Sequence, residues 1–151
     1  MITPVEIPEY LFAPCSMSCM VCYVYLKNKK PCNGCLGNDI NKPERCKTCA
    51  IKVCVQAKGI KYCYECPDFP CKAISNMERS YRKRYGAGLI ENAQYVKENG
   101  IVNFQVKELK KLTCYYCNGI VALHDGICSE CGKEHENYSK ILKNKVKKEK
   151  I

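Results

Sequence analysis

The sequence contains no tryptophan, only two histidines, and no apolar run long enough to span a bilayer, so a membrane protein is not expected. Residues 1–11 hold two prolines and two glutamates, without the basic flank and apolar centre of a secretory signal. The chain also lacks a Ser/His/Asp set, a glycine-rich phosphate loop and a convincing pair of acid–base carboxylates. These absences favour a non-enzymatic protein.

What the chain has in excess is cysteine, with 15 among 151 residues. A length of this order suggests one compact domain or two small ones, which disulfides or bound metal would stabilise. Because no secretory signal is evident, we expect a cytoplasmic, reducing compartment in which metal ligation is favoured over disulfides.

The formal net charge of +10 indicates nucleic-acid binding only weakly. Metal-bound cysteines are thiolates, and a zinc ion held by four of them carries a net charge of about −2. About three such ions would reduce the basic excess to roughly +4.

A tandem repeat lies at the centre of the chain, where the spacing C-x2-C-x4-C occurs twice in succession. Its members are Cys46, Cys49, Cys54, Cys63, Cys66 and Cys71. Two thiolates separated by two residues can bind one metal ion from a single tight turn. One such pair is weak evidence for metal, but tandem copies flanked by further pairs are strong evidence.

The last four cysteines form the clearest set. Cys114-x2-Cys117 and Cys128-x2-Cys131 flank a short apolar stretch, which predicts a zinc ribbon with a β-hairpin whose turn is His124-Asp125-Gly126.

The remaining eleven cysteines leave the division into sites open. The spacing of Cys19-x2-Cys22 and Cys32-x2-Cys35 predicts a second closed site, in which Gly34 lets the backbone turn its amides toward a thiolate. One alternative for the tandem repeat is a single site made by its first two cysteines of each copy, with Cys54 and Cys71 spare or joined by Cys15 in a third site. Another is two zinc ions that share bridging thiolates. In every case we expect all fifteen cysteines to be metal ligands: Cys15, Cys19, Cys22, Cys32, Cys35, Cys46, Cys49, Cys54, Cys63, Cys66, Cys71, Cys114, Cys117, Cys128 and Cys131.

The expected fold is a small metal-stabilised α+β protein. Residues 1–111 would form a cysteine-knuckle domain, in which short helices over 72–111 cover the metal sites. A zinc-ribbon β-hairpin would follow over 112–133, and then a basic tail over 134–151.

Local signals predict where these helices begin and end. Ser16 or Ser18 is a candidate cap for a helix that reaches Leu26. Ser75 with Glu78 reads as a capping box, and Asn103 as the cap of a later helix. Gly86 and Gly100 are expected to end two helices, and Met77, Tyr81 and Tyr85 to share one packed face.

Iron is the alternative to zinc. Cys15-x3-Cys19-x2-Cys22 matches the [4Fe–4S] motif of radical S-adenosylmethionine enzymes, but the chain is short for their partial barrel and no glycine-rich cofactor segment follows. An iron–sulfur protein for electron transfer or redox sensing is the more plausible form of this alternative. A third hypothesis, metal storage, fits less well because the cysteines lie among helix caps and helices.

We expect that the function of the protein is to bind a partner. Arg79, Arg82, Lys83 and Arg84 form the densest basic cluster, which would meet a phosphate backbone or an acidic protein unless it is simply a solvated helix face. Tyr115 and Tyr116 would stack on bases or pack around the metal. We therefore expect a non-enzymatic zinc adaptor that binds a protein or nucleic acid and no membrane.

The ordered pattern also resembles a known family. The cysteines from Cys15 to Cys54, followed by Lys58-Gly59 and by Glu65-Cys66-Pro67-Asp68-Phe69-Pro70-Cys71, resemble the cysteine-rich family called "domain of unknown function 3795". Tyr81-Arg82-Lys83-Arg84-Tyr85-Gly86 is similar to its longer members, which end in a zinc ribbon. One departure is Ala13-Pro14 before Cys15, where a cysteine–glycine opening is more usual. The resemblance implies metal binding and a cytoplasmic setting, and it implies no reaction.

Overall fold

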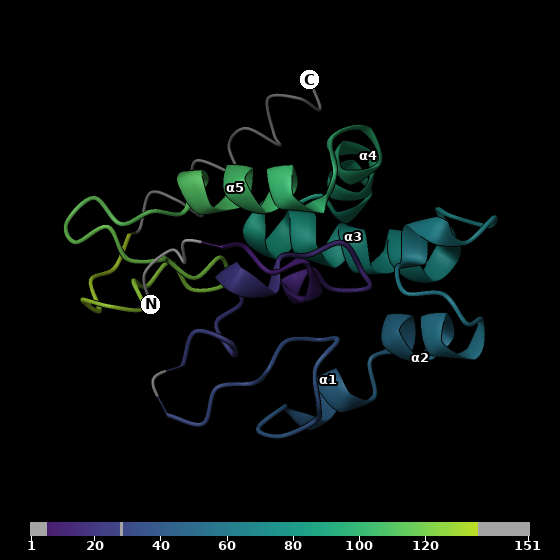
Figure 1. The fold of residues 1–151 in the computed structure, drawn as a ribbon, viewed down its shortest axis with the longest axis horizontal. Coiled ribbons are helices and arrows are strands. Elements are labelled where there is room, and N and C mark those ends of the chain that lie inside the picture. Colours follow the sequence, from purple (N-terminus) through teal and green to yellow (C-terminus); the bar gives the residue numbers. More distant parts are fainter. Residues whose placement is uncertain (1–5, 28, 136–151) are drawn as a thin grey trace.

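Helices and turns make up the structure, a computed structural model that describes residues 6–27 and 29–135 (Figure 1). The elements in chain order are the 3-10 helices η1 (Glu9–Leu11) and η2 (Cys19–Val21), the helices α1 (Glu44–Lys47) and α2 (Ala50–Ala57), η3 (Cys63–Glu65), and the helices α3 (Lys72–Tyr85), α4 (Leu89–Asn99) and α5 (Ile101–Lys111). In the view of Figure 1, α3, α4 and α5 lie above the N-terminal segment (residues 6–27), and α1 and α2 lie below it.

The expected α+β fold with a β-hairpin is wrong. Across residues 6–27 and 29–135 the backbone forms isolated bridges, such as Thr113 with Ile120 and Val121 with Cys128, and no strand or sheet. In the expected ribbon over 112–133, the residues around each cysteine pair form tight turns. A further turn lies between them, in which the Gly126 N–H donates to the Ala122 carbonyl at 2.9 Å. Too few residues remain between the turns for two paired strands.

Residues 72–111 are helical, as expected, and the C-terminal ends of α3 and α4 follow local sequence signals. α3 ends at Gly86, which adopts the left-handed conformation with φ 70°. α4 ends at Gly100, whose N–H donates to the Val96 carbonyl at 2.8 Å. Both glycine stops are therefore confirmed.

The predicted N-terminal caps are wrong. α3 begins three residues before Ser75, with Cys71 as its N-cap, and Glu78 instead accepts a hydrogen bond from the Ile90 N–H at 3.1 Å. α5 begins after Gly100, and the Asn103 side chain donates to the Asn99 carbonyl at 2.7 Å. The side chains of Glu78 and Asn103 thus both bind the backbone of α4, and neither caps the start of its own helix.

The predicted helix from Ser16 or Ser18 to Leu26 is also wrong. Only the single turn η2 forms, and Ser16 has a φ of 75°, which a right-handed helix excludes. The Ser18 hydroxyl donates to the Gln105 side chain of α5 and does not cap η2. The Ser18 hydroxyl, which was expected to cap the helix, is therefore engaged in a tertiary hydrogen bond.

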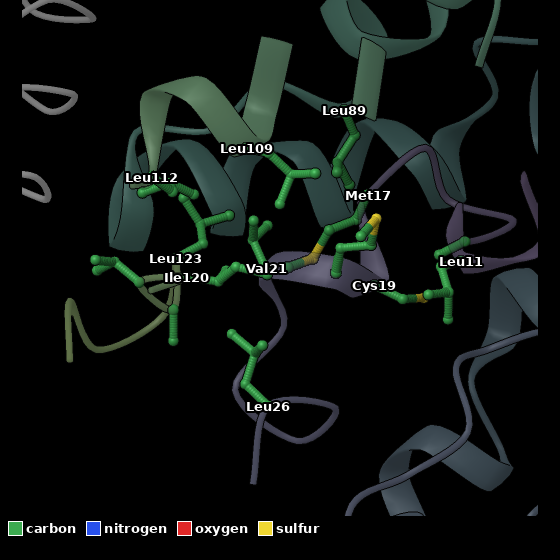
Figure 2. Packing of buried hydrophobic residues seen from close by; sticks show 14 of the residues in the cluster. Leu11, Met17, Cys19, Val21, Leu26, Leu89, Leu109, Leu112, Ile120 and Leu123 are labelled. Carbon is green, nitrogen blue, oxygen red and sulfur yellow. The ribbon is translucent and has the colours of Figure 1, made fainter. Parts of the chain in front are cut away.

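The main core joins the N-terminal segment to the C-terminal cysteine turns. Figure 2 shows Leu109, Leu112 and Leu123 gathered around Val21, which is fully buried. Met77, Tyr81 and Tyr85 of α3 pack against this core from one helix face, as their spacing predicts. A second, smaller core contains Phe12, Tyr62, Val96 and Phe104.

None of the helices in the described part of the chain is long and apolar enough to cross a bilayer. The division at residue 112 remains a prediction. The predicted tail over 134–151 falls almost entirely outside the described residues, which end at His135.

Candidate metal centres

The C-terminal cysteines lie in two turns of the same design. The Asn118 N–H donates to the Cys114 carbonyl at 3.1 Å, and the Gly132 N–H donates to the Cys128 carbonyl at 3.0 Å. Asn118 and Gly132 both have positive φ values, of 63° and 73°. Each cysteine pair is therefore held in a closed turn that ends four residues after its first cysteine.

Backbone amides in these turns point at sulfur. The Tyr116 N–H donates to Cys114 Sγ and the Glu130 N–H donates to Cys128 Sγ, each at 3.4 Å. Gly119 is required here, because a Cβ at this position would lie 3.0 Å from Cys128 Sγ and 2.8 Å from Glu130 Cβ. Donors aimed at sulfur favour the thiolate, which is the form that binds metal.

The four sulfurs converge on one point. Those of Cys114, Cys117, Cys128 and Cys131 lie within 4.8 Å of one another, with 3.8 Å between Cys114 and Cys131 and 3.5 Å between Cys117 and Cys128. A tetrahedral zinc ion with Zn–S bonds of about 2.3 Å separates its sulfurs by about 3.8 Å. The residues present therefore fit one tetrahedral metal ion.

The thiols of this set differ in acidity. The pKa of Cys128 is lowered to about 7: burial opposes the shift, but the N–H groups of Cys131 and Glu130 and the thiols of Cys117 and Cys114 outweigh it. The pKa of Cys117 is raised to about 12, although its bond from the Gly119 N–H opposes this, because burial and the neighbouring thiols favour its protonated form. A metal ion bound by these sulfurs would displace the protons that remain on the thiols.

Six N-terminal cysteines surround a separate cavity of about 820 Å³. The cavity lies between the N-terminal segment, the region of α1 and α2, and α3. Its cysteines are Cys15, Cys19, Cys22, Cys35, Cys46 and Cys49. Cys32 is buried and close enough to Cys22 and Cys46 to raise their pKa values, but it does not line the cavity.

Cys19 and Cys35 are in direct contact at this cavity. The Cys35 N–H donates to Cys19 Sγ at 3.4 Å, and Gly34 before it has a φ of 87°, as expected of a glycine that turns an amide toward sulfur. The Cys19 thiol also hydrogen-bonds to Cys35, which lowers the Cys35 pKa to about 7 against the effect of burial, with help from the charges of Lys42 and Lys52. The same hydrogen bond, together with burial, raises the pKa of Cys19.

The other four cysteines, Cys54, Cys63, Cys66 and Cys71, form a third group. Burial raises the pKa of Cys63 to about 11, and the charges of the other three add to this. Lys58 Nζ donates to Cys66 Sγ at 3.0 Å. The first pair of the tandem repeat thus faces the cavity, whereas the second pair is grouped with Cys54 and Cys71. The division of the eleven cysteines into metal sites, with or without Cys54 and Cys71, remains a prediction.

Only part of the basic cluster on α3 is exposed and could bind a partner. Arg82 is half-buried and forms ion pairs with Glu78 at 3.6 Å and Glu91 at 3.5 Å. Arg79, Lys83 and Arg84 are exposed, and Arg84 also lines the cysteine cavity. A partner-binding role for this cluster remains a prediction.

His124 is a site residue that the sequence did not reveal. It stands in the expected turn but also lines the cysteine cavity, where its ring lies 4.8 Å from that of Tyr23 and 4.7 Å from that of Tyr85, between centroids. Its Nδ1 is buried and has no hydrogen-bond partner among the described residues. Burial lowers the pKa of His124 to about 4, and the charge of Arg45 adds to this while Asp125 opposes it.

The fold and these thiol groups define a small cysteine-rich protein with a four-cysteine site that can hold one metal ion. Residues 11–76 match the family model described as "Protein of unknown function (DUF3795)", which confirms the resemblance over that segment. No curated protein and no solved structure matches the chain.

Proposed function

We propose that the protein binds zinc at its C-terminal four-cysteine site and works as a non-enzymatic adaptor that presents this metal-held module to a partner. The observation that carries the proposal is the convergence of four cysteine sulfurs within 4.8 Å. Zinc is the metal that such a tetrahedral four-thiolate set suits best. A site closed by four protein ligands has no open position for substrate or water, which supports a structural role for this ion.

The first cysteine turn carries the surface that fits a partner. Between its two cysteines, the side chains of Tyr115 and Tyr116 are 73% and 64% exposed. Lys133 Nζ lies 4.1 Å from the centroid of the Tyr116 ring. Exposed aromatic rings beside a cation are the groups on which unpaired bases stack, so single-stranded nucleic acid is the partner that this surface fits best.

The test uses the zinc-loaded full chain and a fluorescent single-stranded oligonucleotide of mixed sequence, with binding followed by anisotropy. Replacing Tyr115 and Tyr116 with alanine should weaken binding at least tenfold, since stacking contributes about 1–3 kcal/mol per base. Tyr10→Ala is the matched control, because Tyr10 is 54% exposed but lies in the N-terminal segment. Binding should also weaken steeply with added salt.

Two results would contradict a nucleic-acid partner: no measurable binding at low salt, or equal affinities for the wild type and the tyrosine variant. The adaptor proposal would then require a protein partner. Its test is whether one protein recovered with the wild type is lost with the tyrosine variant and kept with Tyr10→Ala.

A further inference from the structure

The six-cysteine cavity has no role in the C-terminal zinc site, and its chemistry points to a second kind of metal centre. Three of its cysteines come from the motif Cys15-x3-Cys19-x2-Cys22, and three come from later in the chain, at Cys35, Cys46 and Cys49. Segments that are up to 34 residues apart in sequence thus direct thiols at a single space.

We infer that this cavity binds an iron–sulfur cluster of the [4Fe–4S] type, with its four thiolate ligands drawn from the six cysteines of the cavity. The inference is independent of the proposed function, because the two concern different cysteines. It names a site for the iron–sulfur alternative that the sequence raises.

The distances between the ligand sulfurs distinguish a site for a cluster from a site for a single metal ion. In the described part of the chain, only the C-terminal set brings four potential ligand atoms within 4.8 Å of one another. Among the cavity cysteines, Cys19 and Cys35 are in contact, but no three of the six have sulfurs within 4.8 Å of one another, and together they line a volume of about 820 Å³. Ligands of one zinc ion lie about 3.8 Å apart, whereas each thiolate of a [4Fe–4S] cluster binds a different iron, so that the ligand sulfurs stand farther apart.

The charge around the cavity suits an anionic centre. Arg45, Lys52 and Arg84 line the same space as the six cysteines. A cluster bound by four thiolates carries net negative charge, which nearby cations offset. The Cys35 N–H that donates to Cys19 Sγ at 3.4 Å is the kind of hydrogen bond to ligand sulfur that raises a cluster's reduction potential.

An aromatic wall shields one side of the cavity. Tyr23, Tyr81 and Tyr85 surround His124, with centroid distances of 4.8, 6.1 and 4.7 Å. The buried Nδ1 of His124 has no partner among the residues that the structure describes, and a neutral imidazole can donate to a cluster sulfur or a ligand thiolate. His124 is therefore a positioning residue that would adjust the potential of the cluster.

The experiment is anaerobic reconstitution of the full chain with equal amounts of ferrous and ferric iron and with sulfide, in the presence of zinc, so that two Fe2+, two Fe3+ and four sulfides make up a [4Fe–4S] core of charge 2+ without a further oxidant. We expect about four irons and four sulfides per chain, and a brown absorption that bleaches when dithionite donates one electron to the cluster. Replacing Cys15, Cys19 and Cys22 together with serine should abolish the colour, because only three of the six cavity cysteines then remain.

The matched control is the pair Cys117→Ser and Cys131→Ser, which should lose zinc and keep the iron. It distinguishes failure of the C-terminal zinc site from failure of the cluster site. His124→Gln should keep the cluster and shift its midpoint potential, a change that a purely structural role would not produce.

Alkylation of the wild type provides a readout that does not depend on whether the variants fold. In the reconstituted protein, at least four of the six cavity cysteines should react with iodoacetamide at least tenfold more slowly than in the iron-free protein, as mapped by mass spectrometry. A colourless chain that takes up only zinc would overturn the inference, and so would iron binding that leaves these cysteines equally reactive.

Discussion

The backbone N–H of Leu123 donates a hydrogen bond to the carbonyl oxygen of Val21, with 2.9 Å between nitrogen and oxygen. Both residues are buried in the main core (Figure 2). The next residues along the chain, Cys22 and His124, both line the cysteine cavity. This one contact thus attaches the C-terminal cysteine turns to the N-terminal segment and brings a histidine to the N-terminal thiols.

Although Gln105 is polar, we expect it to contribute strongly to the stability of the fold. It is fully buried, its Oε1 accepts from the Ser18 hydroxyl, and its Nε2 donates to the Leu11 carbonyl at 3.0 Å. Gln105→Ala leaves two buried partners unsatisfied and should lower the free energy of unfolding by about 1–3 kcal/mol or more. Chemical denaturation of the metal-loaded protein measures this.

Gln94→Ala is the control for Gln105, because Gln94 is exposed and bonds only to Glu98 within α4. It should change the free energy of unfolding by less than about 0.5 kcal/mol. Equal effects of the two substitutions would contradict the structural role assigned to Gln105.

Sequence reasoning succeeded where the signal was local. The glycine stops of α3 and α4 were predictable because Gly86 and Gly100 end helices through their own backbone conformations. The convergence of the last four cysteines was predictable because both pairs lie in turns of the same spacing.

Sequence reasoning failed where a distant residue decides the outcome. The helix expected after Ser18 does not form, and the Ser18 hydroxyl instead binds Gln105, 87 residues away. The β-hairpin was wrong because the cysteine turns leave too little backbone for strands. His124 could not be recognised, since its place at the cavity depends on the contact between Leu123 and Val21.

Phe104 should be the most sensitive position of the small core. It is fully buried in α5, and its ring meets that of Phe12 edge-on with centroids 5.3 Å apart. Phe104→Ala should lower the free energy of unfolding by about 3–5 kcal/mol because it leaves a cavity. Val102 lies on the same helix and is 42% exposed, so Val102→Ala should lower the free energy of unfolding much less. If both substitutions cost the same in denaturation, the small core is not packed as described.

His124 should make the stability of the protein depend on pH. Its pKa is about 4 in the folded protein, chiefly because of burial, and about 6.5 in an unfolded chain. Between these values the unfolded state binds more protons, so stability falls as the pH falls from about 6.5 to about 4, by about 3 kcal/mol at most.

The measurement for His124 is the difference in free energy of unfolding between the wild type and His124→Gln at each pH. Taking the difference removes the acid sensitivity of metal binding, which the two proteins share. The advantage of the wild type should shrink toward acid pH. A difference that stays constant over this range would show that His124 is not held neutral by burial.

The most direct test of the zinc site is the metal content of the protein, measured by elemental analysis on the wild type and on the variant with Cys117→Ser and Cys131→Ser. Tyr115→Phe, next to the ligand Cys114, serves as the control that should keep all its metal. We predict that the double variant loses one zinc ion per chain, and that X-ray absorption at the zinc edge shows the lost ion to have had four sulfur ligands at about 2.3 Å. Unchanged zinc content in the double variant would contradict the assignment of this site.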